Sequence, residues 1–142
     1  ASTKVVEYVS YTCSHCADFA NKILPELEKT YVETGKVKLI YRDFPLDGIA
    51  LRAAALARCL PEDRYFPFVK MLFQRQQNWA RAEDPQKQLT QLAALAGLSP
   101  DVATACMNDM KILDAITKAR TAAAEEYKIS ATPTFIFNDK AA

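Results

Sequence analysis

The sequence predicts an α/β fold in which a βαβ unit is followed by a long helical insertion and then by a further strand. Strand, helix and strand patterns succeed one another at residues 5–9, 14–31 and 37–41. Helical patterns without a convincing strand fill residues 49–127, and an apolar strand pattern returns at 132–137. With 142 residues, half of them apolar, the chain is long enough to bury a sizeable core.

The first strand and helix follow from apolar patterns. Residues 5–9 form a short, β-branched apolar run, which indicates a buried strand. The helix over 14–31 presents one apolar face, built from Phe19, Ala20, Ile23, Leu24, Leu27 and Tyr31. A crossover of helix length between the strands at 5–9 and 37–41 predicts that these two strands pair in parallel.

Three segments organise the chain: residues 1–48 as the βαβ part, 49–127 as the helical insertion and 128–142 as the returning strand part. Within the insertion, Ser99 and Pro100 form an N-cap with proline at the first helical position. Its large apolar side chains are expected in the core, with a substrate-gripping groove as the alternative: Phe66, Phe68, Phe73 and Trp79. After the strand at 132–137, Asn138 and Asp139 predict a hairpin turn whose second strand we expect to be missing.

Charge argues against a nucleic-acid partner, and hydropathy argues against a membrane-spanning helix. The 18 Lys and Arg residues nearly balance the 17 Asp and Glu residues. Without a basic stripe, a nucleic acid is an unexpected partner. No apolar run reaches the roughly 18 residues that indicate a membrane span.

Cys13 and Cys16 form a C-x-x-C pair directly after the first strand, at the expected start of the helix. Free backbone N–H groups and the positive end of the helix dipole favour a thiolate at the first sulfur. The second sulfur lies one turn along, close enough for a disulfide. This pattern predicts a disulfide-exchange site. The alternative, a zinc site of Cys13, His15 and Cys16, lacks a clear fourth ligand.

Two further residues stand out near the pair. His15 is the only histidine, so hydrolases that need a second, distant histidine are excluded, and a solvated side chain without a role is the plain alternative. Glu7 places a carboxylate in the middle of an apolar strand, which is costly unless it is paired or protonated. A side chain that reaches solvent at the sheet edge is the other interpretation of Glu7.

The segment from Glu7 to Cys16 resembles the active-site stretch of the DsbA family of disulfide oxidoreductases. The segment 131–135 resembles the cis-proline loop of the same family, and the helical insertion within a thioredoxin-like fold is the DsbA plan. The resemblance covers essentially the whole chain. It implies that Cys13 is the exposed nucleophile and Cys16 the buried resolving cysteine, with Ser14 and His15 tuning the redox potential. Ser14 departs from the proline that is usual before the histidine.

The resemblance assigns roles to three more residues. It implies a cis bond between Thr132 and Pro133, which would face the disulfide and leave the backbone of Thr132 to pair with an extended substrate. It matches Glu7 to a buried acid that takes or relays the proton of Cys16. The family fold continues with another strand and a terminal helix, which we expect this chain to lack.

Cys59 and Cys106 remain once Cys13 and Cys16 are paired locally. The resemblance implies a structural disulfide between them, because some DsbA relatives have a second disulfide in the helical domain. Such a bridge would indicate an oxidising compartment. Two buried free thiols are the alternative.

The predicted function is therefore protein dithiol:disulfide exchange, as a net oxidant of cysteine pairs in exported proteins. No cofactor or metal is expected, and the oligomeric state is left open. The resemblance implies reduced or unfolded exported proteins as substrates, a quinone-linked membrane reoxidant of the DsbB type, and a periplasmic location for a mature chain without its signal peptide. The rivals are an isomerase or reductase of the same fold and a non-catalytic binding or chaperone module.

Overall fold

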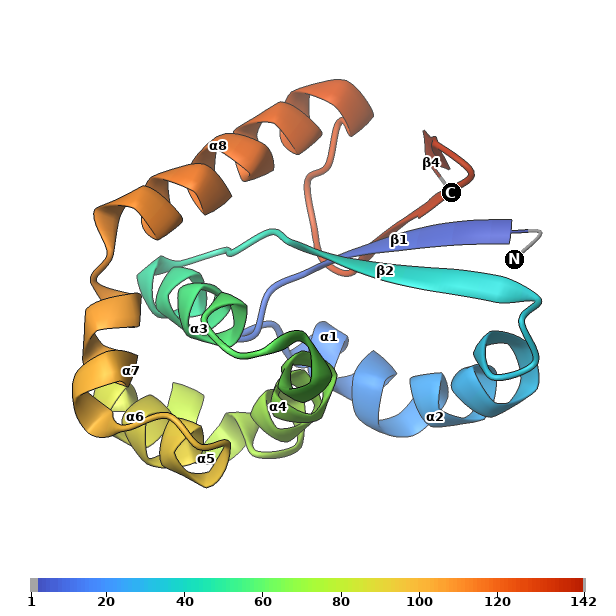
Figure 1. Ribbon diagram of the computed structural model, residues 1–142. Coiled ribbons are helices and arrows are strands. Elements are labelled where there is room, and N and C mark those ends of the chain that lie inside the picture. Colours follow the sequence, from blue (N-terminus) through green and yellow to red (C-terminus); the bar gives the residue numbers. More distant parts are fainter. Residues whose placement is uncertain (1–2, 142) are drawn as a thin grey trace.

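The computed structural model describes residues 3–141 and contains one mixed sheet surrounded by helices (Figure 1). Its elements follow in the order β1 (Thr3–Val9), α1 (Ser14–Asp18), η1 (Phe19–Ile23), α2 (Leu24–Leu27), η2 (Glu28–Val32), β2 (Val37–Asp43), α3 (Gly48–Arg58), α4 (Glu62–Gln74), α5 (Gln76–Ala80), α6 (Pro85–Leu95), α7 (Pro100–Met107), α8 (Met110–Tyr127), β3 (Thr134–Phe137) and β4 (Lys140–Ala141). Ala1 and Ser2, at the start of the segment predicted as 1–48, lie outside the described residues, as does Ala142.

The strands have the order β2-β1-β3-β4. β1 and β2 are parallel from Thr3↔Val37 to Val9↔Asp43, as the crossover predicts, and β3 runs antiparallel to β1. Because side chains alternate along a strand, Val5 and Glu7 share one face of the sheet, whereas Tyr8 points to the other. The ring of Tyr8 lies 6.3 Å from that of Tyr127 on α8, so α8 covers the face opposite to Glu7 (Figure 1).

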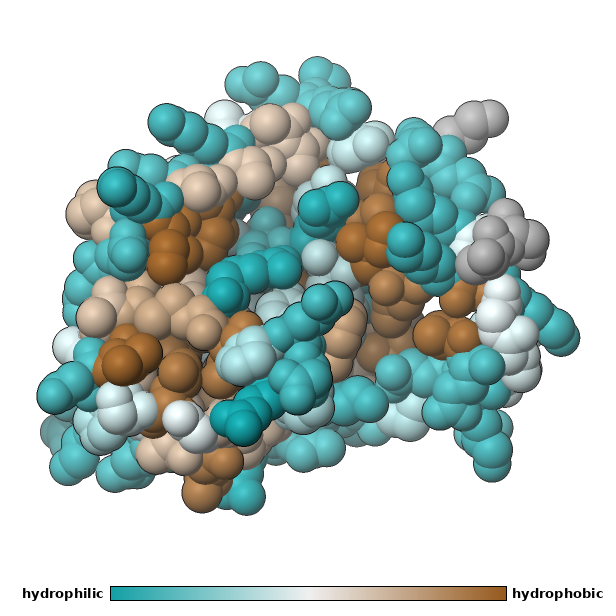
Figure 2. All heavy atoms as spheres, in the orientation of Figure 1, coloured by the Kyte–Doolittle hydropathy of each residue, from teal (hydrophilic) through white to brown (hydrophobic). Residues whose placement is uncertain are grey.

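The helix predicted over 14–31 is a continuous helical run over 14–32, with two π-helical segments, η1 and η2. Pro25, at the start of α2, has no N–H to donate to the preceding turn, and η1 lies just before it. Part of the predicted apolar face is not buried: Ile23, Leu27 and Tyr31 are all exposed. Together with Phe19, Leu24 and strand residues, Leu27 and Tyr31 line an apolar hollow of about 330 Å³ between the run and the sheet, where Figure 2 shows apolar side chains.

The helices of the insertion pack around a core of large apolar side chains that includes Phe68, Phe73 and Trp79. The expectation that Phe66 lies in the core is wrong, since its side chain is 45% exposed. Its ring instead lies 5.6 Å from the ring of Tyr41 on β2 and 5.1 Å from that of Tyr65. The helix face that carries Phe66 thus meets the outer strand of the sheet rather than the interior of the insertion.

The expected absence of a second hairpin strand is wrong. Asn138 and Asp139 have positive φ angles of 48° and 71°, and the chain turns back through them. Lys140 and Ala141 then pair with Phe137 and Ile136 as β4. Such left-handed conformations are tolerated by Asn and Asp, which explains why this pair makes the turn.

Candidate active site

The two cysteines lie where β1 passes into α1. Cys13 is the N-cap residue of α1, with an extended backbone (φ −79°, ψ 119°). Its N–H donates to the carbonyl of Ser10 at 3.1 Å, and its own carbonyl accepts the N–H of Ala17 at 3.1 Å. The Cys13 side chain thereby starts at the end of the helix where backbone N–H groups are free.

The Cys13 sulfur meets the loop that precedes β3. Cys13 is partly buried, and its thiol donates to the carbonyl of Thr132 at 3.4 Å. The Thr132–Pro133 peptide bond is cis. Residues 119 positions apart in sequence are thus in contact at the sulfur, because β3 pairs with β1 in the middle of the sheet.

Cys16 is fully buried beneath Cys13, and both cysteines are free thiols. Burial raises the pKa of Cys16 to about 12, although hydrogen bonding from the backbone of Ser10 and the side chain of Thr132 favours its thiolate. Apart from this contact, the buried Thr132 hydroxyl has no hydrogen-bond partner among the described residues. Cys16 therefore holds its proton at neutral pH, and the neighbouring hydroxyl is available when that proton leaves.

Glu7 is a buried acid without a partner. Its side chain is 1% exposed, and neither carboxyl oxygen forms a hydrogen bond within the described structure. Desolvation raises the pKa of Glu7 to about 8. Across the sheet Glu7 is in register with Tyr41 and Phe135. Burial, and then the charge of Glu7, raise the pKa of Tyr41.

Ser14 and His15 occupy the first turn of α1 and are both exposed. The fold places them beside Cys13 at the surface, whereas Glu7 and Cys16 are buried below it. Between β1, α1 and β3, the fold thus brings together most of the predicted site residues: Glu7, Cys13, Cys16, Thr132 and Pro133.

Gln76 lies at the site although nothing in the sequence singles it out, and it is 4% exposed. Its side-chain Nε2 donates to the carbonyls of Tyr11 and Cys13, each at 2.9 Å. A glutamine between apolar helical patterns carries no signal of such a contact, because the partners are backbone atoms 63 and 65 residues away. Only the tertiary structure reveals it.

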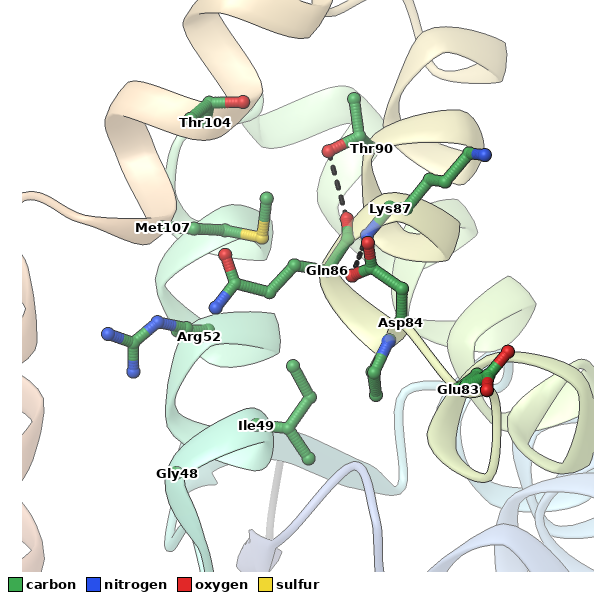
Figure 3. A pocket seen from close by; sticks show the side chains of 11 residues that line it. Gly48, Ile49, Arg52, Glu83, Asp84, Gln86, Lys87, Thr90, Thr104 and Met107 are labelled. Carbon is green, nitrogen blue, oxygen red and sulfur yellow. Dashed lines mark hydrogen bonds between the residues drawn. The ribbon is translucent and has the colours of Figure 1, made fainter.

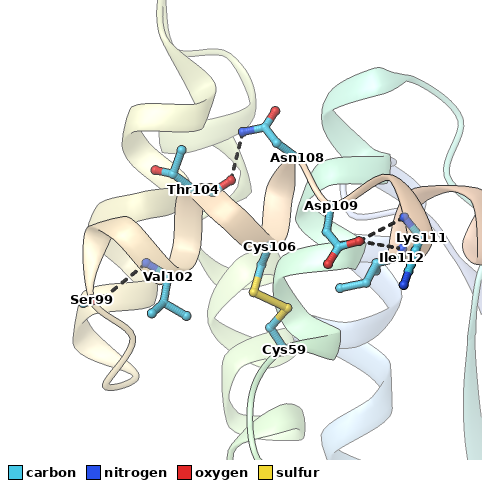
Figure 4. Close-up of a disulfide and its surroundings, with 9 residues drawn as sticks. All are labelled: Cys59, Ser99, Val102, Thr104, Cys106, Asn108, Asp109, Lys111 and Ile112. Atoms are coloured by element: carbon cyan, nitrogen blue, oxygen red, sulfur yellow. Dashed lines mark hydrogen bonds between the residues drawn. A yellow bond between two sulfur atoms is a disulfide. The ribbon is translucent and has the colours of Figure 1, made fainter.

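Cys59 and Cys106 form a disulfide that joins the end of α3 to α7, with their Cα atoms 6.4 Å apart (Figure 4). The pair lies within the helical insertion. The alternative of two free thiols does not apply at these positions.

Two further observations concern ligands. A polar hollow of about 520 Å³ lies among α3, α6 and α7, with Arg52, Gln86 and Met107 on its walls (Figure 3). None of the predicted site residues lines it. Over residues 3–141, no three His, Cys, Asp or Glu residues cluster so that they could hold a metal ion. No helix in this part of the chain is both long and apolar enough to cross a membrane.

The fold and the cysteine pair define a thioredoxin-like chain, and the sequence agrees. It matches the thioredoxin family over residues 1–142, so the chain belongs to this family. The crystal structure of α-DsbA1 from Wolbachia pipientis superposes with a TM-score of 0.89 at 36% identity, covering 96% of this chain and 70% of that one.

The relatives in sequence carry names from the same chemistry. A Rickettsia typhi protein whose name describes it as a protein-disulfide oxidoreductase is 35% identical over 135 residues, covering 94% of this chain and 50% of that protein. Disulfide bond formation protein D of Bacillus subtilis is 26% identical over 145 residues, which is 99% of this chain and 65% of that protein. The chain thus spans about half the length of the rickettsial relatives it matches.

Proposed function

We propose that this chain carries the redox centre of a DsbA-like protein dithiol:disulfide oxidoreductase that oxidises cysteine pairs in other proteins. The observation that carries the proposal is the placement of Cys13, partly exposed at a helix N-terminus and in contact with the Thr132 carbonyl, above the buried Cys16. Free helix N–H groups stabilise a thiolate at Cys13, and a stabilised thiolate makes a good leaving group and a strong oxidant.

The reaction transfers one electron pair from the substrate to the enzyme. A substrate thiolate attacks Cys13 of the Cys13–Cys16 disulfide, and Cys16 leaves as a thiolate that takes up a proton. A second substrate thiolate then attacks the substrate sulfur of the mixed disulfide, and Cys13 leaves as a thiolate. The substrate gains a disulfide, and the enzyme ends as a dithiol.

Glu7 fits the part of proton donor and acceptor for Cys16. With its pKa near 8, about a tenth of this carboxyl is ionised at pH 7, so both forms are present in the working range. Its protonated form can supply the departing Cys16 thiolate, and its ionised form can take the proton back when the disulfide is restored. Ser14 and His15, exposed beside Cys13, are proposed to tune the potential.

Substrate and location follow the same proposal. An extended substrate would pair with the backbone at Thr132, which lies next to the reactive sulfur. The Cys59–Cys106 disulfide suits an oxidising compartment, so we infer a periplasmic or otherwise exported protein. Reduced exported proteins would be the substrates, and a quinone-linked membrane protein of the DsbB type the reoxidant.

A direct test is the oxidation of a reduced, unfolded protein with two cysteines by the preformed disulfide of the enzyme. We expect stoichiometric oxidation by the wild type and none by Cys13→Ala. In Cys16→Ser we expect reaction with an activated substrate disulfide to stop at a mixed disulfide on Cys13, which mass spectrometry detects. Undiminished substrate oxidation by Cys13→Ala would refute the proposal, and undiminished activity of this variant in cells would favour a binding module.

The isomerase or reductase alternative predicts a different outcome. Such an enzyme would reshuffle a substrate with wrong disulfides, or reduce it, faster than it introduces new disulfides. The same substrate, presented once reduced and once with scrambled disulfides, separates these activities.

A further inference from the structure

Gln76 joins the helical insertion to the backbone of the cysteine loop, which is the segment 10–13 between β1 and α1. It is the first residue of α5, which belongs to the insertion, and its side chain is almost completely buried. Both N–H bonds of a glutamine amide nitrogen can donate. Here Nε2 has two acceptors, the carbonyls of Tyr11 and Cys13, each at 2.9 Å.

The rest of the loop is held by different groups. The N–H of Leu46 donates to the Ser10 hydroxyl at 3.2 Å, and the Thr12 hydroxyl donates to Asp47 at 2.9 Å. The phenol groups of Tyr11 and Tyr65 lie 3.3 Å apart. These contacts use the side chains of the loop, whereas the Gln76 amide contacts its main-chain carbonyls.

The two carbonyls matter electrostatically because they belong to the short backbone segment that carries the reactive sulfur. Each carbonyl oxygen is the negative end of a peptide dipole, and one of them belongs to Cys13 itself. A thiolate on Cys13 adds a negative charge close to these oxygens, which repel it. Two N–H donors directed at the oxygens offset part of that repulsion, and in a buried site the effect is larger than in water.

We propose that Gln76 is a positioning residue that makes Cys13–Cys16 a stronger oxidant. Its two hydrogen bonds stabilise negative charge at Cys13, which only the dithiol form can carry, because both sulfurs of the disulfide form are neutral. The helical insertion would then set the redox balance of the site through one side chain. This inference rests on the proposed oxidoreductase function.

The test is the equilibrium of Cys13–Cys16 with glutathione in Gln76→Met, which keeps the length of the side chain and removes both donors. We expect the equilibrium to shift about fivefold toward the enzyme disulfide, as the loss of hydrogen bonds worth about 1 kcal/mol in one redox form would produce. Gln76→Glu has nearly the same shape but faces the carbonyls with oxygen. It should shift the equilibrium in the same direction, because a carboxyl can donate at most one hydrogen bond where the glutamine amide donates two.

Asn21→Leu is the matched control. The Asn21 side-chain amide donates to the carbonyl of Phe73 at 3.1 Å, so it makes the same kind of bond between the helical run and the insertion, but its acceptor carbonyl does not belong to the cysteine loop. We expect this variant to leave the glutathione equilibrium unchanged. Urea unfolding of both redox forms adds a second readout, because a merely structural role would destabilise both forms equally.

The outcomes distinguish the role of Gln76 from the proposed function. If the wild type exchanges with glutathione and both Gln76 variants have the wild-type equilibrium, the role of Gln76 is refuted and the oxidoreductase stands. That role is refuted as well if both variants destabilise the two redox forms equally. If the wild-type cysteines do not exchange at all, the proposed function fails and the inference fails with it.

Discussion

Cys16 and Glu7 are two acids whose protons are held by burial. The pKa of Cys16 rises to about 12 and that of Glu7 to about 8, in both cases chiefly because the charged form is desolvated. The sequence already marked Glu7 as anomalous, since a carboxylate in an apolar strand must be paired or protonated. The structure favours protonation, because no hydrogen-bond partner lies near either oxygen in the described part of the chain.

Glu7 makes the stability of the fold depend on pH. The folded-state pKa of about 8 exceeds the ordinary value of 4.5, so between these values the folded state binds a proton that the unfolded state has released. Stability therefore falls as pH rises through this window, by about 1.4 kcal/mol per pH unit, and is constant on either side. Glu7→Gln, which cannot ionise, should match the wild type near pH 4 and exceed it at pH 8.

Urea unfolding of the dithiol forms of both proteins at several pH values measures this difference. A stability difference that stays constant from pH 5 to pH 8 would mean that Glu7 does not titrate as described. The same pair of proteins also tests the proton role, because the variant should resolve mixed disulfides more slowly if the carboxyl serves Cys16.

At the scale of elements, Asp47 connects the cysteine loop to α3. One carboxylate oxygen caps α3 by accepting the N–H of Ala50 at 2.8 Å, and the other accepts the Thr12 hydroxyl at 2.9 Å. Asp47→Ala should lower the free energy of unfolding by about 1 kcal/mol, as expected for the loss of an N-cap. Asp47→Asn retains a cap oxygen and should lose less. Equal losses in the two variants, measured by urea unfolding, would contradict the role of this cap.

Elements with a regular pattern were predictable, and departures from the pattern were not. The strands and the helical segments follow the periodicity of apolar residues, so β1, β2 and the helical run lie where the sequence places them. The exposure of Ile23 and Tyr31 and the two π segments depend on how the run meets the sheet. A two-residue strand such as β4 is too short for any pattern to predict.

The site residues also divide into those that the sequence marks and those that it does not. Cys13, Cys16 and Glu7 are local anomalies in sequence, and the resemblance to a known family linked them to Thr132 and Pro133. Gln76 has no local anomaly, since its function lies in two hydrogen bonds to distant backbone carbonyls. Contacts of this kind arise only when the insertion folds back on the βαβ part.

At the scale of the whole molecule, the Cys59–Cys106 disulfide closes a loop across the insertion, between residues 47 apart in sequence. Replacing both cysteines with serine should lower the free energy of unfolding by about 2–4 kcal/mol, because the unfolded chain regains the entropy of the open loop. The glutathione equilibrium of Cys13–Cys16 should not change, since Cys59 and Cys106 belong to the end of α3 and to α7, whereas Cys13 and Cys16 belong to α1 and its N-cap. Urea unfolding and a redox titration of the same variant check both parts, and a shifted redox equilibrium would contradict the separation of the two cysteine pairs.

The central claim is that the fold stabilises the dithiol form of Cys13–Cys16 enough to make it an oxidant. The most direct measurement is the reduction potential of the wild-type pair, titrated against glutathione at pH 7. We predict a value between about −180 and −120 mV, in the range of proteins that donate disulfides. A value near −270 mV, that of thioredoxin, would contradict the claim and identify a reductant instead.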